Sequence, residues 1–423
     1  MSSSGTKKAA GSKSPQPSSG GGPSSKRAKK SSGRLNEIPA RTTERFSRQS
    51  AVDDIVKYFR EHGYVVIEGV LSRTQCGQHI IEQIVEILQK QRWTRTLTVV
   101  DPLDGRTLDV HADARRYLEV ITSSDIPSDV WARYREEWTL HRGFGACCDP
   151  SVFHLALVWL VRQDPFLYAV ASAIIECKHL WVDINRSIHK LPGEGEEEFL
   201  HWDIPFFTDF VSVLTAISGK VMYTPGELVV VPGTHTKDSH RDIYYYYRPL
   251  YPNAKPTDAK TALDPEKEDV LDLFGKAIAV ELPAGCAVFW DPRLLHGVRK
   301  NPRKGHIVFG MYLGYSVAGS RPEYKKRCGV DEKWDRINSY ENGIAPELWP
   351  SFDPVHYYPK RFMNFPNIIE SYIRKLPACD CSIVTRTMHN GKVVPHLVPV
   401  PDPDYTAPQL SRLGRRLLGA IDW

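Results

Sequence analysis

Beyond about Leu180 the chain becomes a series of short runs of β-branched and aromatic residues, separated by proline and glycine. Such runs are typical of strands, and the prolines and glycines between them mark turns. Many short strands with frequent turns predict a β-sandwich or jelly roll. The predicted strands are Phe210–Ile217, Leu228–Val231, Ala277–Leu282, Ala287–Trp290 and Ile307–Tyr315.

The residues before these strands predict a helix–strand–helix unit and then a further helical region. Apolar residues at helical spacing indicate a helix that stops at Gly63, and Tyr64–Ile67 follows as a β-rich run. The sequence Ser72-Arg73-Thr74-Gln75 is a capping box and predicts the start of a second helix. Residues 152–177 are predicted to be helical with a break at Pro165. The expected fold class is therefore mainly β with flanking helices.

The net charge of +5 on this 423-residue chain is concentrated at its N-terminus. Residues 1–34 hold eight basic and no acidic residues, which leaves 47 basic against 50 acidic residues in the remainder. Residues 1–45 also have almost no large apolar side chains, so we expect a disordered basic tail. The slightly acidic body excludes a globally basic nucleic-acid coat, and it confines attraction to nucleic acid to the tail or to local patches.

The tail also bears on the cellular compartment. The cluster Lys26-Arg27-Ala28-Lys29-Lys30 resembles a nuclear import signal, and a solubilising run of charge explains it equally well. No stretch approaches the ~18 apolar residues of a membrane span, and the N-terminal residues lack the apolar core of a secretory signal. We expect a nuclear or cytoplasmic protein, with the nucleus favoured, whose eight cysteines are mostly thiols.

The segment Phe199–Pro205 contains the motif with the most chemical content. If it is extended, His201 and Asp203 point to one face and Trp202 to the other, because side chains alternate along a strand. One imidazole and one carboxylate on a common face can chelate a cation. A second histidine from a distant strand would complete a 2-His-1-carboxylate triad, the usual site of Fe(II) oxygenases, and His296 is the best candidate.

A histidine and an aspartate at this spacing occur often by chance, so the surrounding sequence decides the interpretation. The chain resembles the phytanoyl-CoA dioxygenase family of Fe(II)- and 2-oxoglutarate-dependent oxygenases at five places, in the family's order, over roughly residues 51–316. The five places are Glu61–Ser72, His201–Asp203, Gly226–His235, Ala284–Gly297, and Arg303-Lys304 before Ile307–Tyr315.

The resemblance implies a double-stranded β-helix, a jelly roll of the cupin type, with iron near one end. It implies His201, Asp203 and His296 as the metal ligands and an arginine after the second histidine as the anchor of 2-oxoglutarate. A bidentate guanidinium suits the far carboxylate of 2-oxoglutarate better than an ammonium, and Arg303 is favoured over Arg299. Lys190 matches a family position that can also contact the co-substrate, although a solvated loop lysine is an equal reading.

Two features distinguish the chain from the family pattern. Trp202 stands where glutamine is common, on the face away from the metal. The segment between His235 and His296 is longer than expected and contains Tyr244–Tyr247, so we predict an insertion at about residues 236–272. The domains expected are the tail at 1–45, an oxygenase domain at 46–320 that includes this insertion, and a C-terminal wrapping extension at 321–423.

The expected function is an Fe(II)- and 2-oxoglutarate-dependent dioxygenase that uses O2 to hydroxylate an organic substrate, a small metabolite or a lipid-like molecule. Asp203 is present, which argues against the halogenating members of the family. One alternative is a nuclear oxygenase that acts on a modified nucleobase or chromatin, with nucleic acid bound through the basic tail. Another is a β-helix protein that binds a ligand without turnover. No membrane partner is expected.

Overall fold

The computed structural model describes most of the predicted oxygenase domain and parts of the C-terminal extension. The described residues are 38–90, 98–101, 104–109, 113, 116, 119, 146–147, 153–185, 187–190, 200–203, 213–247, 275–298, 308–321, 330–344, 346, 381–387, 393–399 and 405–423. The nuclear import signal suggested for Lys26–Lys30 lies outside them and stays a prediction. Residues 40–46, around the predicted end of the tail, form strands β1 and β2 that join two different sheets.

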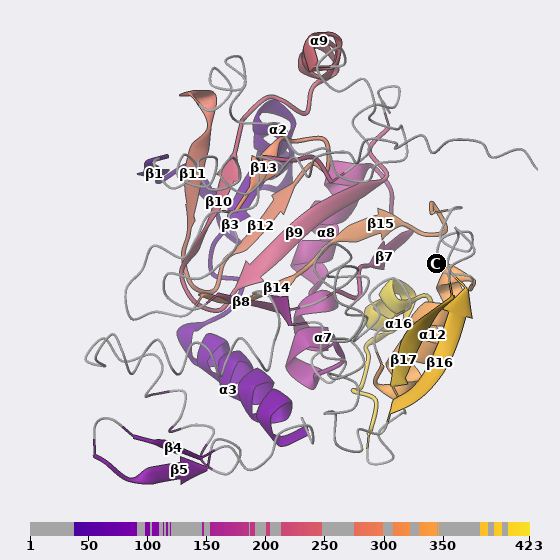
Figure 1. The fold of residues 1–423 in the computed structure, drawn as a ribbon. Coiled ribbons are helices and arrows are strands. Elements are labelled where there is room, and N and C mark those ends of the chain that lie inside the picture. The colour runs from indigo at the N-terminus through magenta and orange to yellow at the C-terminus, as the bar shows by residue number, and fades with distance from the viewer. Residues whose placement is uncertain are drawn as a thin grey trace, which may run out of the picture.

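Two β-sheets form the centre of the molecule (Figure 1). The smaller sheet has the order β1 (Ala40–Arg41), β11 (Ile278–Leu282), β10 (Gly226–Val230) and β13 (His296–Gly297). The larger sheet has the order β2 (Arg45–Phe46), β3 (Tyr64–Ile67), β12 (Ala287–Trp290), β9 (Ala216–Met222), β14 (Val308–Tyr312), β8 (Ser187–Lys190) and β6 (Ala146–Cys147), and β15 (Tyr315–Val317) pairs with both β9 and β7 (Leu180–Val182). The pairs β4 (Thr98–Val100) with β5 (Thr107–Asp109) and β16 (Cys381–Thr387) with β17 (Val393–Pro399) are separate hairpins.

The alternation of side chains along the larger sheet separates two buried cores. Val66 of β3 and Val288 of β12 pack with Leu228 and Val280 of the smaller sheet, so one core lies between the sheets. The residues next to them in sequence, such as Phe289, contribute to a second core that the helices cover. Each fully buried valine or leucine stabilises this arrangement by about 1.5–3 kcal/mol. Two facing sheets with helices on the outside confirm the predicted fold class.

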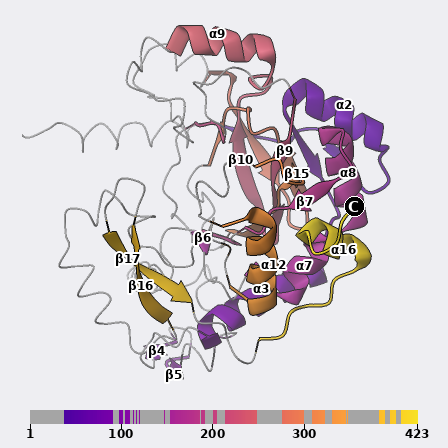
Figure 2. The ribbon, with the colours of Figure 1, turned by 90° about the vertical axis from the view of Figure 1, so that its right-hand side faces the viewer.

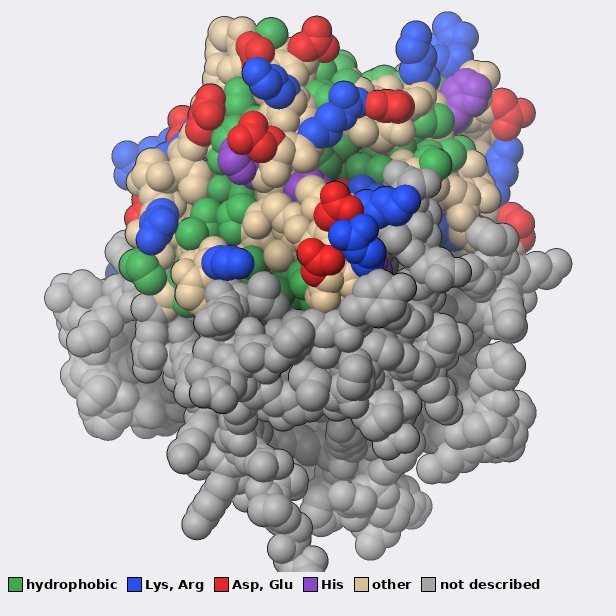
Figure 3. Space-filling model, turned by 90° about the horizontal axis from the view of Figure 1, so that it is seen from above, with side chains coloured by type: hydrophobic (Ala, Val, Ile, Leu, Met, Phe, Trp, Pro, Cys, Tyr) green, Lys and Arg blue, Asp and Glu red, His purple; other side chains and the backbone are tan. Residues whose placement is uncertain are grey.

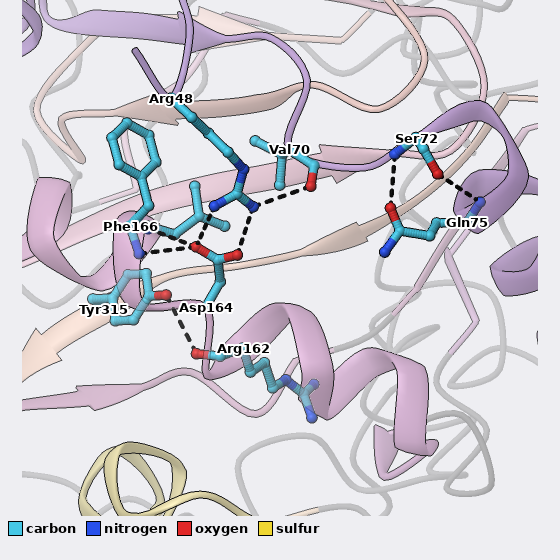
Figure 4. Close-up of polar contacts among 9 residues, drawn as sticks. Arg48, Val70, Ser72, Gln75, Arg162, Asp164, Phe166 and Tyr315 are labelled. Atoms are coloured by element: carbon cyan, nitrogen blue, oxygen red, sulfur yellow. Dashed lines mark hydrogen bonds and ion pairs between the residues drawn. The ribbon is translucent and has the colours of Figure 1, made fainter. Parts of the chain in front are cut away.

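The N-terminal unit forms as its local sequence predicts. Helix α2 (Val52–His62) ends at Gly63, which has a left-handed φ of 80°. Helix α3 (Arg73–Lys90) begins at the predicted capping box: the Ser72 backbone N–H donates to Gln75 Oε1 at 2.9 Å, and the Gln75 N–H donates to Ser72 Oγ at 3.2 Å (Figure 4). Both bonds satisfy N–H groups that the first turn of a helix leaves unpaired.

The predicted break at Pro165 separates α7 (Ala156–Arg162) from α8 (Pro165–Ile175). Asp164 caps α8, because its Oδ1 accepts from the backbone N–H groups of Phe166 and Leu167 at 3.0 and 3.1 Å. The same carboxylate pairs with Arg48, whose guanidinium lies 2.6 Å from Oδ2 (Figure 4). One aspartate therefore both starts a helix and fastens the segment before α2 to it.

Part of the predicted C-terminal extension packs on the body of the protein. Helix α12 (Glu332–Asn342) holds α16 (Arg412–Leu418) beside α7 and β7 (Figure 2). The buried Arg336 guanidinium donates to the carbonyls of Val182, Leu417 and Leu418 at 2.6 to 3.0 Å. These bonds join the end of the chain to β7, and Trp423 stacks on Tyr168 with ring centroids 5.4 Å apart.

The structure differs from the predicted elements in three places. Strand β9 starts at Ala216 and continues to Met222, so residues 213–215 of the predicted strand precede it, and residues 210–212 lie outside the described residues. The run Ile307–Tyr315 divides into β14 and β15 around Gly314, where an added Cβ would lie 2.5 Å from an Asp183 oxygen. The start of the predicted insertion is helix α9 (Lys237–Tyr247), so the four tyrosines are helical. Among the described helices, none combines the length and apolar character needed to cross a membrane.

Candidate metal centre

The backbone brings the two predicted histidine ligands together. His201 and His296 form an antiparallel bridge in which the His201 N–H donates to the His296 carbonyl at 2.7 Å and the His296 N–H donates to the His201 carbonyl at 3.0 Å. The Asp203 N–H donates to the Pro292 carbonyl at 3.0 Å, which extends the pairing. Residues directly opposite in such a pair point to the same face. The segment with His201 and Asp203 therefore lies against the segment that ends at His296.

The side chains of the three residues converge on one point. One donor atom from each of His201, Asp203 and His296 lies within 4.8 Å of the other two. His201 Nε2 is 3.8 Å from Asp203 Oδ1, and His296 Nε2 is 3.6 Å from Asp203 Oδ2. Both histidines are buried, and the Asp203 side chain is 27% exposed. Trp202, between the ligands in sequence, is buried, as expected for a side chain on the opposite face.

Neighbouring groups orient the carboxylate. Ser218 Oγ donates to Asp203 Oδ2 at 2.9 Å, and Trp290 Nε1 donates to the same oxygen at 3.1 Å. Ser218 and Trp290 are cross-strand partners in the register of β9 and β12. Because the two donors come from adjacent strands of the larger sheet, the position of Asp203 depends on the pairing of those strands.

The protonation of the second histidine is also set by its surroundings. His296 Nδ1 lies 2.9 Å from the carbonyl oxygen of Leu294. A carbonyl only accepts hydrogen bonds, so Nδ1 carries the proton and Nε2 presents its lone pair. A ring nitrogen held in this way is the usual support of a metal-binding histidine.

These observations test whether the residues fit Fe(II). Two imidazoles and one carboxylate form the donor set of a 2-His-1-carboxylate site, in which three ligands occupy one face of the ion and leave positions for other ligands. Nε2 of His296 is in the required form, and the Asp203 carboxylate is oriented by two donors. The donor set and the groups around it therefore fit an iron ion.

The predicted co-substrate residues are placed less fully than the metal ligands. Arg303 and its competitor Arg299 lie outside the described residues. Lys190 is the last residue of β8, and its backbone is the register partner of Val308 on β14. The roles of Arg303 and Lys190 remain predictions.

His235 is a structural residue at a distance from the three ligands. Its ring Nε2 donates to the Arg60 carbonyl at 2.9 Å, and its ring lies against Gly63, where an added Cβ would come within 2.5 Å of Nδ1. Burial lowers the pKa of His235 below the usual range, so the ring is neutral near pH 7. These contacts are those of a structural corner rather than of a metal ligand.

Sequence reasoning missed Ser218 and Trp290. Ser218 belongs to no recognised motif, and Trp290, although it lies in the family-like segment Ala284–Gly297, was given no role there. Each residue acts through the register of its strand. The one available signal was a serine followed by Lys220 at alternate positions of an otherwise apolar strand, since polar residues on a buried face require partners.

Comparison with known families gives a match over the centre of the chain. Residues 59–302, more than half of the chain, match the sequence model of a family described as phytanoyl-CoA dioxygenase. The matched segment contains all three residues of the metal centre. A search of curated proteins gave no match.

Several solved structures resemble the fold at low identity. The chain is similar to the epimerase SnoN, solved with Fe3+, alpha ketoglutarate and nogalamycin RO, at 15% identity over 63% of this chain and 84% of that chain, with a TM-score of 0.33. It is similar to the carbocyclase SnoK from nogalamycin biosynthesis at 15% identity, over 65% and 88% of the two chains, with a TM-score of 0.37. HygX from Streptomyces hygroscopicus, solved with nickel and 2-oxoglutarate, gives 13% identity, 64% and 89% coverage and a TM-score of 0.38.

Proposed function

Since the chain belongs to the phytanoyl-CoA dioxygenase family of Fe(II)- and 2-oxoglutarate-dependent oxygenases, we propose that it hydroxylates an organic substrate, a small metabolite or a lipid-like molecule. Iron and 2-oxoglutarate are its cofactor and co-substrate. The observation that supports the proposal is the convergence of the donor atoms of His201, Asp203 and His296 on one point. We assign these three residues as the iron ligands.

The residues of the chain have defined tasks in this reaction. Iron and 2-oxoglutarate together supply oxidation by O2, in which one oxygen atom enters the succinate formed with CO2 and the other is inserted into a C–H bond. His201, Asp203 and His296 would hold the ion from one side and leave its other positions to the co-substrate and oxygen. Ser218 and Trp290 hold the Asp203 carboxylate, and the Leu294 carbonyl holds the proton of His296 on Nδ1.

Arg303 and Lys190 complete the proposed co-substrate site. Arg303 follows the second histidine and would bind the far carboxylate of 2-oxoglutarate through two parallel hydrogen bonds. Arg303→Ala should raise the concentration of 2-oxoglutarate needed for half-maximal turnover by more than about tenfold, and Arg303→Lys should restore little, because an ammonium lacks the planar fork. A larger effect of Arg299→Ala would move this role to Arg299.

The insertion at about residues 236–272 is proposed to contact the substrate. Val230 of β10 pairs with His296, and the chain leaves that end of β10 toward α9 (Figure 1). The insertion therefore starts from the end of the barrel that holds the metal centre. Loops beside a site that must exclude water commonly close over the substrate, and this position suits such a lid.

The surface favours a small substrate over nucleic acid. On the face seen in Figure 3, which carries α9, the described acidic and basic side chains are interspersed. A face that binds nucleic acid is expected to gather lysines and arginines into a stripe. The basic tail is the remaining candidate for such contacts, and it is not needed for the proposed chemistry.

The test is turnover with a substrate screen. The protein is incubated without oxygen with Fe(II) and 2-oxoglutarate, oxygen is admitted, and succinate is measured in the presence of acyl-CoAs, free metabolites, and methylated DNA or RNA. A product heavier than the substrate by one oxygen atom supports hydroxylation. A product of unchanged mass would indicate epimerisation instead, and a product that has lost hydrogens would indicate cyclisation. Asp203→Ala should abolish succinate formation with an unchanged circular dichroism spectrum. A wild-type protein that forms no succinate under any condition would overturn the proposal.

A further inference from the structure

Lys220 is a buried cation inside the barrel. Its side chain lies on β9, and the residue is only 5% exposed. Of the described strands β3, β9, β10, β11, β12 and β14, which enclose the core between the sheets, only β9 contains a lysine or arginine, and that residue is Lys220. Burying a charge is unfavourable unless it is paired, so this position needs an explanation.

The side chain points to the same face as the support of the metal centre. Ser218 and Lys220 are two residues apart on β9, so both lie on one face of the sheet. Ser218 binds Asp203, and the next residue on that face after Lys220 is Met222, a member of the core between the sheets. One two-residue step along a strand covers about 6.5–7 Å. Lys220 thus lies one two-residue step along β9 from Ser218, the residue that binds the metal ligand Asp203.

Aromatic rings hold the ammonium in place. Nζ of Lys220 lies 5.3 Å from the ring centroid of Trp290 and 5.1 Å from that of Tyr312. Trp290 also reaches the metal centre, since its N–H donates to Asp203 and its ring centroid is 5.3 Å from that of His296. The attraction between the ammonium and the two rings offsets part of the hydration energy that the buried cation loses. Within the described part of the chain, no carboxylate forms an ion pair with Lys220.

Strand β14, which pairs with β9, contains no basic residue that could take the place of Lys220. Tyr312 of β14 is the register partner of Lys220, and β14 from Val308 to Tyr312 contains no basic residue. Arg303 lies outside the described residues. Among the described residues of β9, β12 and β14, the basic side chain is therefore that of Lys220.

We infer that Lys220 binds the far carboxylate of 2-oxoglutarate. The inference rests on the proposed function, because it assumes that the keto acid end of this five-carbon diacid is held at the iron. A diacid held in this way presents a second carboxylate a few ångströms away. Lys220, which forms no ion pair with a described carboxylate, lies one strand step from Ser218, the residue that binds Asp203. Each carboxylate oxygen can accept more than one hydrogen bond, so a contact with Lys220 is compatible with the separate proposal for Arg303.

The test compares two keto acids without turnover. 2-Oxoglutarate and 2-oxopentanoate, which lacks the far carboxylate, are titrated into Mn(II)-loaded protein without oxygen, and their dissociation constants are measured by calorimetry. The variants are Lys220→Met, which keeps an unbranched stem against the two rings, and Lys220→Gln, which keeps polarity. Lys333→Met is the control, because Lys333 is a surface lysine that pairs with Asp422 at 3.0 Å. The affinity for Mn(II) on the same samples reports that the metal centre is intact.

Loss of the charge-assisted contact should weaken 2-oxoglutarate binding by about tenfold or more in both Lys220 variants, and leave 2-oxopentanoate binding unchanged. Lys333→Met should bind both acids as the wild type does. Lys220 variants that bind Mn(II) and still prefer 2-oxoglutarate as strongly as the wild type would overturn the inference while leaving the proposed function in place. A wild-type protein that binds Mn(II) but neither keto acid would instead overturn the proposed function.

Discussion

The hydrogen bond from Ser218 to Asp203 gives the sharpest test of how the fold supports the metal. Ser218→Ala removes one hydroxyl from β9 and leaves Trp290 as the remaining donor to Asp203 Oδ2. A hydrogen bond to a charged group contributes about 1.5–3 kcal/mol. Since about 1.4 kcal/mol corresponds to a factor of ten, the dissociation constant for the metal should rise about 10- to 100-fold.

The assay is a titration of Mn(II), or of Fe(II) without oxygen, into wild type and variant, with circular dichroism melting on the same samples. Ser316→Ala is a matched control. Ser316 is also a buried serine, on β15 opposite Ala216 of β9, and its hydroxyl has no hydrogen-bond partner among the described residues. The control should bind metal as the wild type does. Equal affinities for Ser218→Ala and the wild type would refute the idea that this serine orients the carboxylate.

Three further predictions concern stability. Gly285→Ala should lower the free energy of unfolding by about 2 kcal/mol or more, because φ is +78° and the new Cβ would lie 2.2 Å from the Leu71 carbonyl oxygen. Gly319 also has a positive φ, but no atom lies near its Cβ position, so Gly319→Ala should lower the free energy of unfolding by only about 1–2 kcal/mol in the same denaturant titration. Asp164→Ala should lower the free energy of unfolding by about 1–2 kcal/mol, because the cap of α8 is lost. Asp164→Asn should lower it by less, because the amide oxygen can still accept from the helix N–H groups. Equal losses for the two variants would contradict the capping role. Burial lowers the pKa of His79 to about 4, so on acidification the unfolded chain binds a proton before the folded chain does. The free energy of unfolding should therefore fall between about pH 6.5 and pH 4, by up to about 1.4 kcal/mol per pH unit. Replacing His79 with Phe should reduce that slope, as measured by urea titrations at several pH values.

The local elements follow from the sequence because their causes are local. The capping box at Ser72, the stop at Gly63 and the break at Pro165 each act through the backbone of a few neighbouring residues. The same is true of the shared face of His201 and Asp203, which needs only the alternation of an extended segment. The choice of His296 as the third ligand came from family resemblance, and its bridge to His201 agrees with it.

Other features depended on which strands become neighbours. The predicted strand Phe210–Ile217 was placed too early, and the run Ile307–Tyr315 was not recognised as two strands. Short apolar runs have similar local preferences throughout, so their boundaries are set by the partners they pair with. The insertion was predicted without an assigned secondary structure, and its first residues, including the four tyrosines, lie in α9.

The sequence alone determined the candidate ligands, because the spacing of His201 and Asp203 puts both on one face of an extended segment and the family resemblance selects His296. The tertiary structure alone decided what surrounds them. Ser218, Lys220 and Trp290 face the centre only because β9 and β12 pair in one register, and a one-residue shift of either strand would turn that strand's residues away. That register is selected by the packing of the whole core between the sheets, to which residues far apart in the sequence contribute together.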